Sequence, residues 1–483
     1  MSLFVKKSLT QLLASANNDT GLKRTLGPAN LIALGIGAII GAGLFVRTAQ
    51  AASEAAGSAV MLSFVVAAVG CAFAGLCYAE FASMIPVAGS AYTYAYVTMG
   101  EFPAWIIGWA LILEYALAAA TLAISWSQYL NKLLGGAIPY EWCHSPFESA
   151  GGVSGIINIP ALVILFLLTL VLIRGTKESA TLNAVIVFIK VLIVLLFIGL
   201  GWKFINPANH TPFMIPEGTP GHESWKEWGW GGVLGGASIV FFAFIGFDAV
   251  STAAQEAKNP KRDMPIGILG SLVVCTILYI LFGWVLTGIA PWAEFGAAGK
   301  EASVAWAIEH GMPGYDWLSL FITVAILAGF SSVMLVMLMG QSRVFYTMAQ
   351  DGLVPKVFAD VHPKYSTPYK SNWILLIFIS LGGGFLPLEI AGDLTSFGTL
   401  FAFVLVCIAV WIMRVKNPEV QRAFKTPLVP LVPILGALIC TLLIISLDDF
   451  TLTVAFGWML VGLVIYFTYA KKHSKLQNTK SEK

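Results

Sequence analysis

The sequence predicts an all-α polytopic membrane protein with 12 transmembrane helices. Of the 483 residues, 58% are hydrophobic and only 11% are charged, whereas soluble domains carry roughly a quarter charged residues. No hydrophilic stretch is long enough to form a domain, so the surplus of apolar residues must face lipid. The net charge of +2 argues against a nucleic-acid partner.

Twelve apolar runs reach or approach the roughly 20 residues that a helix needs to cross a hydrocarbon core of about 30 Å. The ninth run is the shortest. Their limits are 29–46, 57–79, 103–131, 154–173, 181–202, 230–255, 264–290, 317–342, 371–388, 394–413, 426–447 and 450–470.

The distribution of basic residues predicts the orientation. With the N-terminus inside, most of the 28 Lys and Arg residues fall in cytoplasmic segments. The outside loops then hold only Arg47, Lys132, Lys203, Lys226 and Lys300. We therefore expect a multi-pass protein of the plasma (inner) membrane with both termini cytoplasmic.

The first span contains four glycines between Gly35 and Gly43, and each weakens a helix by roughly 1 kcal/mol relative to Ala. A dinucleotide-binding loop is excluded because Ile40 stands where that motif needs glycine. Gly37 and Gly41 have the spacing of a close helix-packing face. The alternative is an unwound segment at membrane depth, which is tolerated only where it is buried in protein or lines a cavity.

The sixth span favours the unwound segment, because its stretch from Phe242 to Asp248 contains Gly246 and places a carboxylate deep in an apolar run. Spans one and six are five apart, which is typical of two inverted five-helix repeats that each begin with a broken helix. The expected organisation is a cytoplasmic segment 1–28, a first repeat 29–202, an extracellular loop 203–229, a second repeat 230–413, spans eleven and twelve in 414–470, and a cytoplasmic tail 471–483. A short amphipathic helix is expected near 302–310.

Such a break suits a zwitterionic ligand. The half-helix that ends near Ile39 leaves free carbonyls at a negative dipole end, which can accept from an α-ammonium. The half-helix that starts near Ala42 leaves free amides, which can bind an α-carboxylate. Backbone groups alone can then hold an amino acid.

Three segments of the chain resemble the amino acid–polyamine–organocation superfamily, namely Ile39 to Phe45, Phe81 to Tyr94 and Gln255 to Pro265. Two further segments, Gly108 to Tyr115 and Phe424 to Pro433, are similar to its cationic amino acid transporters, and the chain most resembles a bacterial member of that family. The resemblance implies a LeuT-like 5+5 inverted repeat and an amino-acid site. Its substrate-binding residues would be Ile39, Gly41, Ala42, Gly43, Phe242, Ala243 and Ile245.

Ionisable residues inside spans are functional candidates by default. Glu114 either lines the side-chain pocket or ties helices together. Asp248 either caps the second half-helix or faces the site. Ser332 either faces the pocket or hydrogen-bonds within its own helix.

Lys190 lies near the middle of span five, too deep for its stem to reach water comfortably. The resemblance implies a role for it, because some proton-coupled members carry a fifth-span lysine where sodium-coupled relatives bind a cation between spans one, five and eight. We expect Lys190 to serve proton coupling by donating to carbonyls near Gly37 or Ile40.

The sequence thus predicts a secondary active transporter that imports L-amino acids by proton symport with alternating access. An amino-acid exchanger of the same fold is the alternative. A membrane enzyme is disfavoured, because no catalytic motif is present and all six His residues fall outside the spans. A channel is disfavoured by the lack of a filter motif. No cofactor, metal or sodium is expected, and the oligomeric state stays open.

Overall fold

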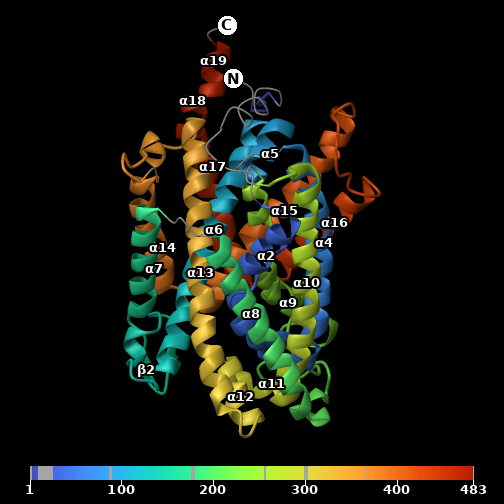
Figure 1. The fold of residues 1–483 in the computed structure, drawn as a ribbon, viewed down its shortest axis with the longest axis vertical. Coiled ribbons are helices and arrows are strands. Elements are labelled where there is room, and N and C mark those ends of the chain that lie inside the picture. Colours follow the sequence, from blue (N-terminus) through green and yellow to red (C-terminus); the bar gives the residue numbers. More distant parts are fainter. Residues whose placement is uncertain are drawn as a thin grey trace.

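A computed structural model of the chain describes residues 3–8, 26–85, 90–175, 180–254, 257–297, 303–365 and 367–481. The described residues form a bundle of long helices that run along the longest axis of the molecule (Figure 1).

Ten of the predicted spans each contain one principal helix. These helices are α4 (Val60–Met84), α6 (Glu101–Leu133), α7 (Ile159–Arg174), α8 (Ala180–Gly201), α10 (Pro260–Ile289), α13 (Asp316–Gln350), α14 (Tyr369–Phe385), α15 (Leu388–Lys416), α16 (Leu431–Ile445) and α17 (Asp449–Ile465).

The first and sixth spans are instead divided. Span one holds α2 (Pro28–Ile39), the π-helical turn η1 (Gly43–Arg47), α3 (Thr48–Ala51) and the π-helical turn η2 (Ala52–Ala56). Span six holds α9 (Gly229–Phe241) and two 3-10 segments, η7 (Phe242–Phe244) and η8 (Asp248–Ala253).

Within the described ranges, eight helical segments are long and apolar enough to cross a membrane. Three further apolar helices are shorter, namely α2, α7 and α16. The chain is therefore a helical membrane protein, as predicted. A total of twelve crossings stays a prediction.

The remaining elements are short. They are η3 (Gly57–Ala59), α5 (Ser90–Thr98), η4 (Tyr140–Trp142), β1 (Ser149–Ala150), β2 (Val153–Ser154), η5 (Trp202–Phe204), η6 (Pro207–His210), α11 (Trp292–Ala297), α12 (Ser303–Gly311), η9 (Lys356–Ala359), η10 (Tyr466–Ala470), α18 (Lys471–His473) and α19 (Lys475–Ser481). The amphipathic helix expected near 302–310 is confirmed by α12. The β1–β2 hairpin was not predicted.

Helix α6 is the centre of the bundle, and 89% of its most apolar stretch is buried. It packs against α13, α15, α14 and α7. Near its start, the Trp109 ring stacks on Trp458 of α17 at 4.6 Å between centroids. A Cβ on Gly462 would lie 2.3 Å from the Trp109 ring, so a glycine there lets α17 approach α6 closely.

Helix α2 packs against α10 through glycines on both helices. A Cβ on Gly35 would lie 2.5 Å from the Ser271 hydroxyl, and one on Gly267 would lie 2.6 Å from the Leu31 Cβ. A Cβ on Gly41 would meet Leu122 and Val333 at ordinary distances of 3.5 and 3.6 Å. The close packing of α2 on α10 therefore depends on Gly35 and Gly267. Gly41 does not take part in it and lies in the helix break.

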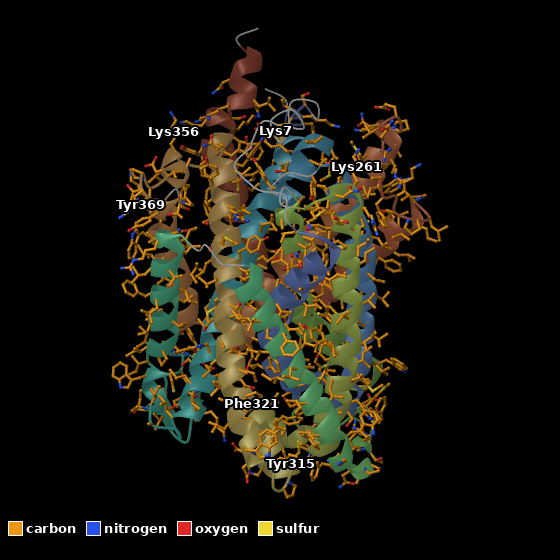
Figure 2. All side chains as sticks on the ribbon, in the orientation of Figure 1. Lys7, Lys261, Tyr315, Phe321, Lys356 and Tyr369 are labelled. Atoms are coloured by element: carbon orange, nitrogen blue, oxygen red, sulfur yellow. The ribbon has the colours of Figure 1, made fainter. Side chains whose placement is uncertain are left out.

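Both described ends of the chain lie at one end of the molecule, here called the terminal end (Figure 1). Lys7 forms an ion pair of 2.5 Å with Asp351 at the end of α13, and the Lys475 amide donates to the Asp351 carbonyl at 3.1 Å. Lys7, Lys261 and Lys356 all lie at this end, whereas Tyr315 and Phe321 lie at the opposite end (Figure 2). This distribution agrees with the predicted orientation, which stays a prediction.

Glu101, at the start of α6, is fully buried and gathers donors from the C-terminal part of the chain. The Tyr466 hydroxyl lies 3.2 Å and the Gln477 amide nitrogen 2.6 Å from Oε1 of Glu101. The Ser474 hydroxyl and the Tyr96 hydroxyl donate to Oε2. A buried carboxylate is tolerated only with such partners.

The prediction that Arg47 lies in an outside loop is wrong. Arg47 ends η1 and has no exposed surface. Its guanidinium pairs with the Asp393 carboxylate of α15 and donates to Gln50 at 2.6 Å. In the sequence, an arginine at the end of an apolar run indicates a loop boundary. Its burial could not be predicted, because its carboxylate partner is 346 residues away.

Candidate functional site

The first helix breaks after Ile39, as predicted. Ile40 has extended backbone with ψ 104°, and the helix resumes at Ala42 before η1 begins at Gly43. The last carbonyls of α2 and the first amides after Gly41 therefore lie at two facing helix ends. These ends carry opposite partial charges.

The sixth span breaks at Ile245 and Gly246. Ile245 is extended with ψ 133°, and Gly246 has φ +116° before η8 begins at Asp248. A Cβ on Gly246 would lie 2.8 Å from the Ala38 carbonyl oxygen. Both the backbone conformation and the space therefore require glycine at this position.

The two breaks touch each other. A Cβ on Gly43 would lie 2.2 Å from the Ala243 Cα, which is far below the contact distance of two non-bonded carbon atoms. The absence of a side chain on Gly43 thus lets the start of η1 rest directly on the backbone of η7.

A cavity lies between the two breaks, α6 and α13. Its volume is about 10 Å³, which is room for about one water molecule. Its walls are Ala38, Ile39, Gly41, Ala42, Gly43, Ala118, Leu122, Phe242, Ile245, Val333 and Met337. Six of the seven predicted substrate-binding residues line it, and the seventh, Ala243, lies behind the wall against Gly43.

Four apolar wall residues from α6 and α13 were missed by the sequence analysis. Ala118 and Leu122 follow Glu114 at the i+4 and i+8 positions of α6, so they continue its helix face. Val333 and Met337 form an i, i+4 pair on α13. The wall opposite the helix breaks is therefore apolar and uncharged.

The three residues predicted for the side-chain pocket are buried but do not line this cavity. Glu114 lies one helical turn before Ala118, where it packs against Gly398 of α15. The Tyr115 hydroxyl lies 3.4 Å from the Asp248 carboxylate. Ser332 is 8% exposed and precedes the wall residue Val333, about 100° away around the helix. Their role in binding stays a prediction.

Tyr279 of α10 joins the two breaks. Its hydroxyl lies 3.1 Å from the Ile39 carbonyl oxygen and 2.9 Å from the Ala243 carbonyl oxygen. One hydroxyl proton can serve only one of the two carbonyls at a time. Tyr279 could not be singled out beforehand, because it is one tyrosine within a long apolar run.

Lys190 reaches the first break from α8. Its ammonium donates to the Gly37 carbonyl at 2.9 Å, and the side chain is 3% exposed. A Cβ on Gly329 of α13 would lie 3.0 Å from the Lys190 Cε. Lys190 thus lies between the first, fifth and eighth spans, and its acceptor is one of the two carbonyls expected from the sequence.

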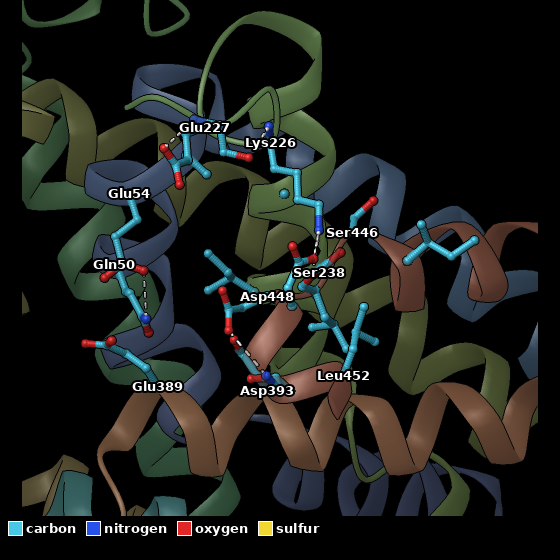
Figure 3. A pocket seen from close by; sticks show the side chains of 18 of the residues that line it. Gln50, Glu54, Lys226, Glu227, Ser238, Glu389, Asp393, Ser446, Asp448 and Leu452 are labelled. Carbon is cyan, nitrogen blue, oxygen red and sulfur yellow. Dashed lines mark hydrogen bonds and ion pairs between the residues drawn. The ribbon is translucent and has the colours of Figure 1, made fainter. Parts of the chain in front are cut away.

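A second cavity, of about 750 Å³, opens at the end of the molecule opposite the terminal end. Carboxylates dominate its charged lining, with Glu54, Glu389, Asp393 and Asp448 around it (Figure 3). Lys226 reaches into it and donates to the Leu447 carbonyl at 2.8 Å. Asp393 pairs with the buried Arg47, which lies along the chain between the first helix break and Gln50 of this cavity's lining. Among the described residues, no group of three His, Cys, Asp or Glu side chains could hold a metal ion.

The chain is similar to known transporters over nearly its whole length. Residues 26–469 match a family model described as amino acid permease. A branched-chain amino acid permease, BcaP, of Bacillus subtilis is 45% identical over 98% of this chain and 99% of its own length. A methylthioribose transporter of the same organism is 42% identical over the same shares. A vacuolar cationic amino acid transporter 4 of Arabidopsis thaliana is 32% identical over 82% of this chain and 64% of its own.

Proposed function

From the premise that this chain belongs to the amino acid permease family of the amino acid–polyamine–organocation superfamily, we propose that it imports L-amino acids together with protons by alternating access. Membership makes it a membrane transporter for small molecules and not an enzyme. The observation that carries the proposal is the cavity enclosed by two touching helix breaks.

The proposed architecture is a LeuT-like 5+5 inverted repeat, with twelve crossings, repeats at 29–202 and 230–413, and both termini cytoplasmic in the plasma membrane. Three observations support it. Each of the two helix breaks opens a set of five spans, the described chain ends lie together, and Lys7, Lys261 and Lys356 share that end (Figure 2).

The substrate ammonium would bind carbonyls of Ile39, Phe242, Ala243 and Ile245. The substrate carboxylate would bind the amides of Ala42 and Gly43. The Tyr279 hydroxyl already holds the Ile39 and Ala243 carbonyls. An ammonium has three protons to donate, so it can join carbonyls that one hydroxyl must share. Binding would thereby favour the conformer in which the two breaks lie together.

We expect the site to require both charged groups of the substrate. Alanine should compete with radiolabelled alanine for uptake, whereas N-acetyl-alanine and alanine methyl ester should not, because each loses a charge that the backbone groups bind. Competition uptake in proteoliposomes measures this. Equal inhibition by alanine and N-acetyl-alanine would remove the proposed site.

The same competition assay tests whether this chain takes a sugar derivative in place of an amino acid. Methylthioribose, the substrate in one relative's name, has neither an ammonium nor a carboxylate. It should therefore leave alanine uptake unchanged. Methylthioribose uptake that alanine does not inhibit would contradict an amino-acid function for this chain.

The uncharged wall from α6 and α13 should select neutral side chains by size. Met337→Ala should increase the apparent affinity for phenylalanine, relative to that for alanine, by about tenfold in competition uptake. The reason is that each added methylene that fits a pocket changes discrimination by about 1–3 kcal/mol. Met339→Ala is the matched control, since Met339 lies on another face of α13 and does not line the cavity. If both variants keep the parent's ratio, Met337 does not limit the pocket.

A further inference from the structure

A groove of about 850 Å³ lies on the surface of the bundle at the terminal end. It runs along α10 and is flanked by α2 and by the segment before α16. It is separate from the cavity between the helix breaks, with which it shares no lining residue. No described residue of α8 lines this groove.

The floor of the groove is a pair of helical stripes on α10. Pro265, Leu269 and Val273 form one stripe at i, i+4 and i+8, and Ile266, Gly270 and Val274 form the next. All six are apolar, and Val273 is 59% exposed. Two parallel stripes with a glycine between larger side chains make a continuous apolar channel along the helix axis.

The beginning of the groove is basic. Lys261 and Arg262 line it in the first turn of α10, and both are exposed. The one acid in this turn offsets only part of their charge, and its carboxylate, Asp263, is buried and accepts from the Asn259 amide at 3.0 Å. The positive end of the α10 helix dipole adds to the positive potential of these two side chains.

The dimensions match one membrane leaflet. Val274 lies thirteen positions after Lys261, which is roughly 20 Å at the rise of an α-helix. A leaflet has about 15 Å of hydrocarbon, half of the bilayer core, below its headgroups. The basic turn therefore lies at headgroup height when the apolar stripes lie among acyl chains.

We propose that this groove binds an anionic phospholipid of the inner leaflet, with its phosphate on Lys261 and Arg262 and one acyl chain along α10. The leaflet named rests on the proposed orientation, whereas the binding itself does not. Ile32 of α2 forms part of the wall, and a Cβ on Gly270 would lie 2.9 Å from its Cδ1. A bound lipid would thus contact the inner half of the first broken helix and stabilise its packing on α10.

The test is native mass spectrometry of the purified full chain, titrated with phosphatidylglycerol and with phosphatidylcholine of identical acyl chains. The parent should retain phosphatidylglycerol in preference. Each basic residue near anionic lipid contributes about fivefold to affinity, so Lys261→Gln with Arg262→Gln should weaken phosphatidylglycerol about thirtyfold and phosphatidylcholine little. The matched control is Lys356→Gln with Lys364→Gln, two exposed lysines at the same end.

Several results would overturn the proposal. One is equal retention of phosphatidylglycerol by the parent and the Lys261/Arg262 variant, provided that both melt at the same temperature. Another is equal affinity for the soluble headgroup glycerophosphoglycerol, which would make the site one for free phosphate esters. A photoreactive acyl chain should label the peptide 265–274, and labelling elsewhere alone would also contradict it. Alanine uptake is not the readout, so a failure here is distinct from a failure of the transport proposal.

Discussion

Lys190→Ala is expected to abolish proton-driven accumulation of alanine in proteoliposomes while alanine counterflow continues. Lys190 donates to the Gly37 carbonyl in the last turns of α2. Under the proposed coupling, a charged Lys190 would hold the first break in shape for the substrate, and a neutral Lys190 would release it. Proton and substrate would then favour the same conformer, which is coupling in free-energy terms. An inward gradient of one pH unit supports about tenfold accumulation for one proton per substrate, and the variant should only equilibrate.

The control for Lys190 is Lys190→Met, which keeps most of the side-chain volume against Gly329 but cannot bind a proton. It should lose accumulation as the Ala variant does, because charge and not volume is at issue. Counterflow confirms that each variant is folded and binds alanine. A Lys190→Ala protein that concentrates alanine with the parent's pH dependence would assign coupling elsewhere. A parent that shows only counterflow would favour the exchanger.

Gly43→Ala is expected to reduce alanine uptake by tenfold or more. The added Cβ would lie 2.2 Å from the Ala243 Cα and 2.6 Å from its amide nitrogen. These are backbone atoms that cannot rotate away, so the two breaks must separate, at an overpacking cost of about 1–3 kcal/mol or more. The separation would also move the Ala243 carbonyl from the Tyr279 hydroxyl, and with it the carbonyls proposed for the ammonium.

Gly199→Ala is the matched control, because the same methyl group on α8 would meet nothing within 4 Å. It should keep the parent's uptake and melting temperature. Gly41→Ala is an intermediate case, since its methyl would meet Leu122 and Val333 at ordinary contact distance inside the cavity. It should fold normally and raise the KM for alanine. Parent-like uptake by Gly43→Ala would show that contact between the breaks is dispensable.

The helix breaks could be predicted from the sequence because their cause is local. Four glycines marked the first break, and Gly246 with a carboxylate in an apolar run marked the second. The breaks after Ile39 and at Gly246 lie at those positions. Lys190 was equally visible, because a charge at membrane depth stands out from its surroundings.

The opposite wall of the cavity could not be predicted, because its residues look like all their neighbours. In a soluble helix an apolar face marks the core, whereas in a membrane helix the lipid face is just as apolar. Leu122, Val333 and Met337 are ordinary members of such helices, and Tyr279 is one hydroxyl in a 30-residue helix. Only the packing of α6, α10 and α13 brings these four residues to the two breaks.

The partners of Glu101 have a consequence for biosynthesis. The Ser474 and Gln477 side chains that satisfy this carboxylate follow it by 373 and 376 residues. Ribosomes therefore deliver the central helix α6 to the bilayer long before these C-terminal hydrogen-bond donors to its first turn exist. During that interval Glu101 has only the Tyr96 hydroxyl among its donors, so it must remain at the water boundary, because a buried charge with too few partners costs several kcal/mol. The last helices to be translated thus determine when α6 can settle to its final depth, and a chain that stops before Ser474 would leave that step unfinished.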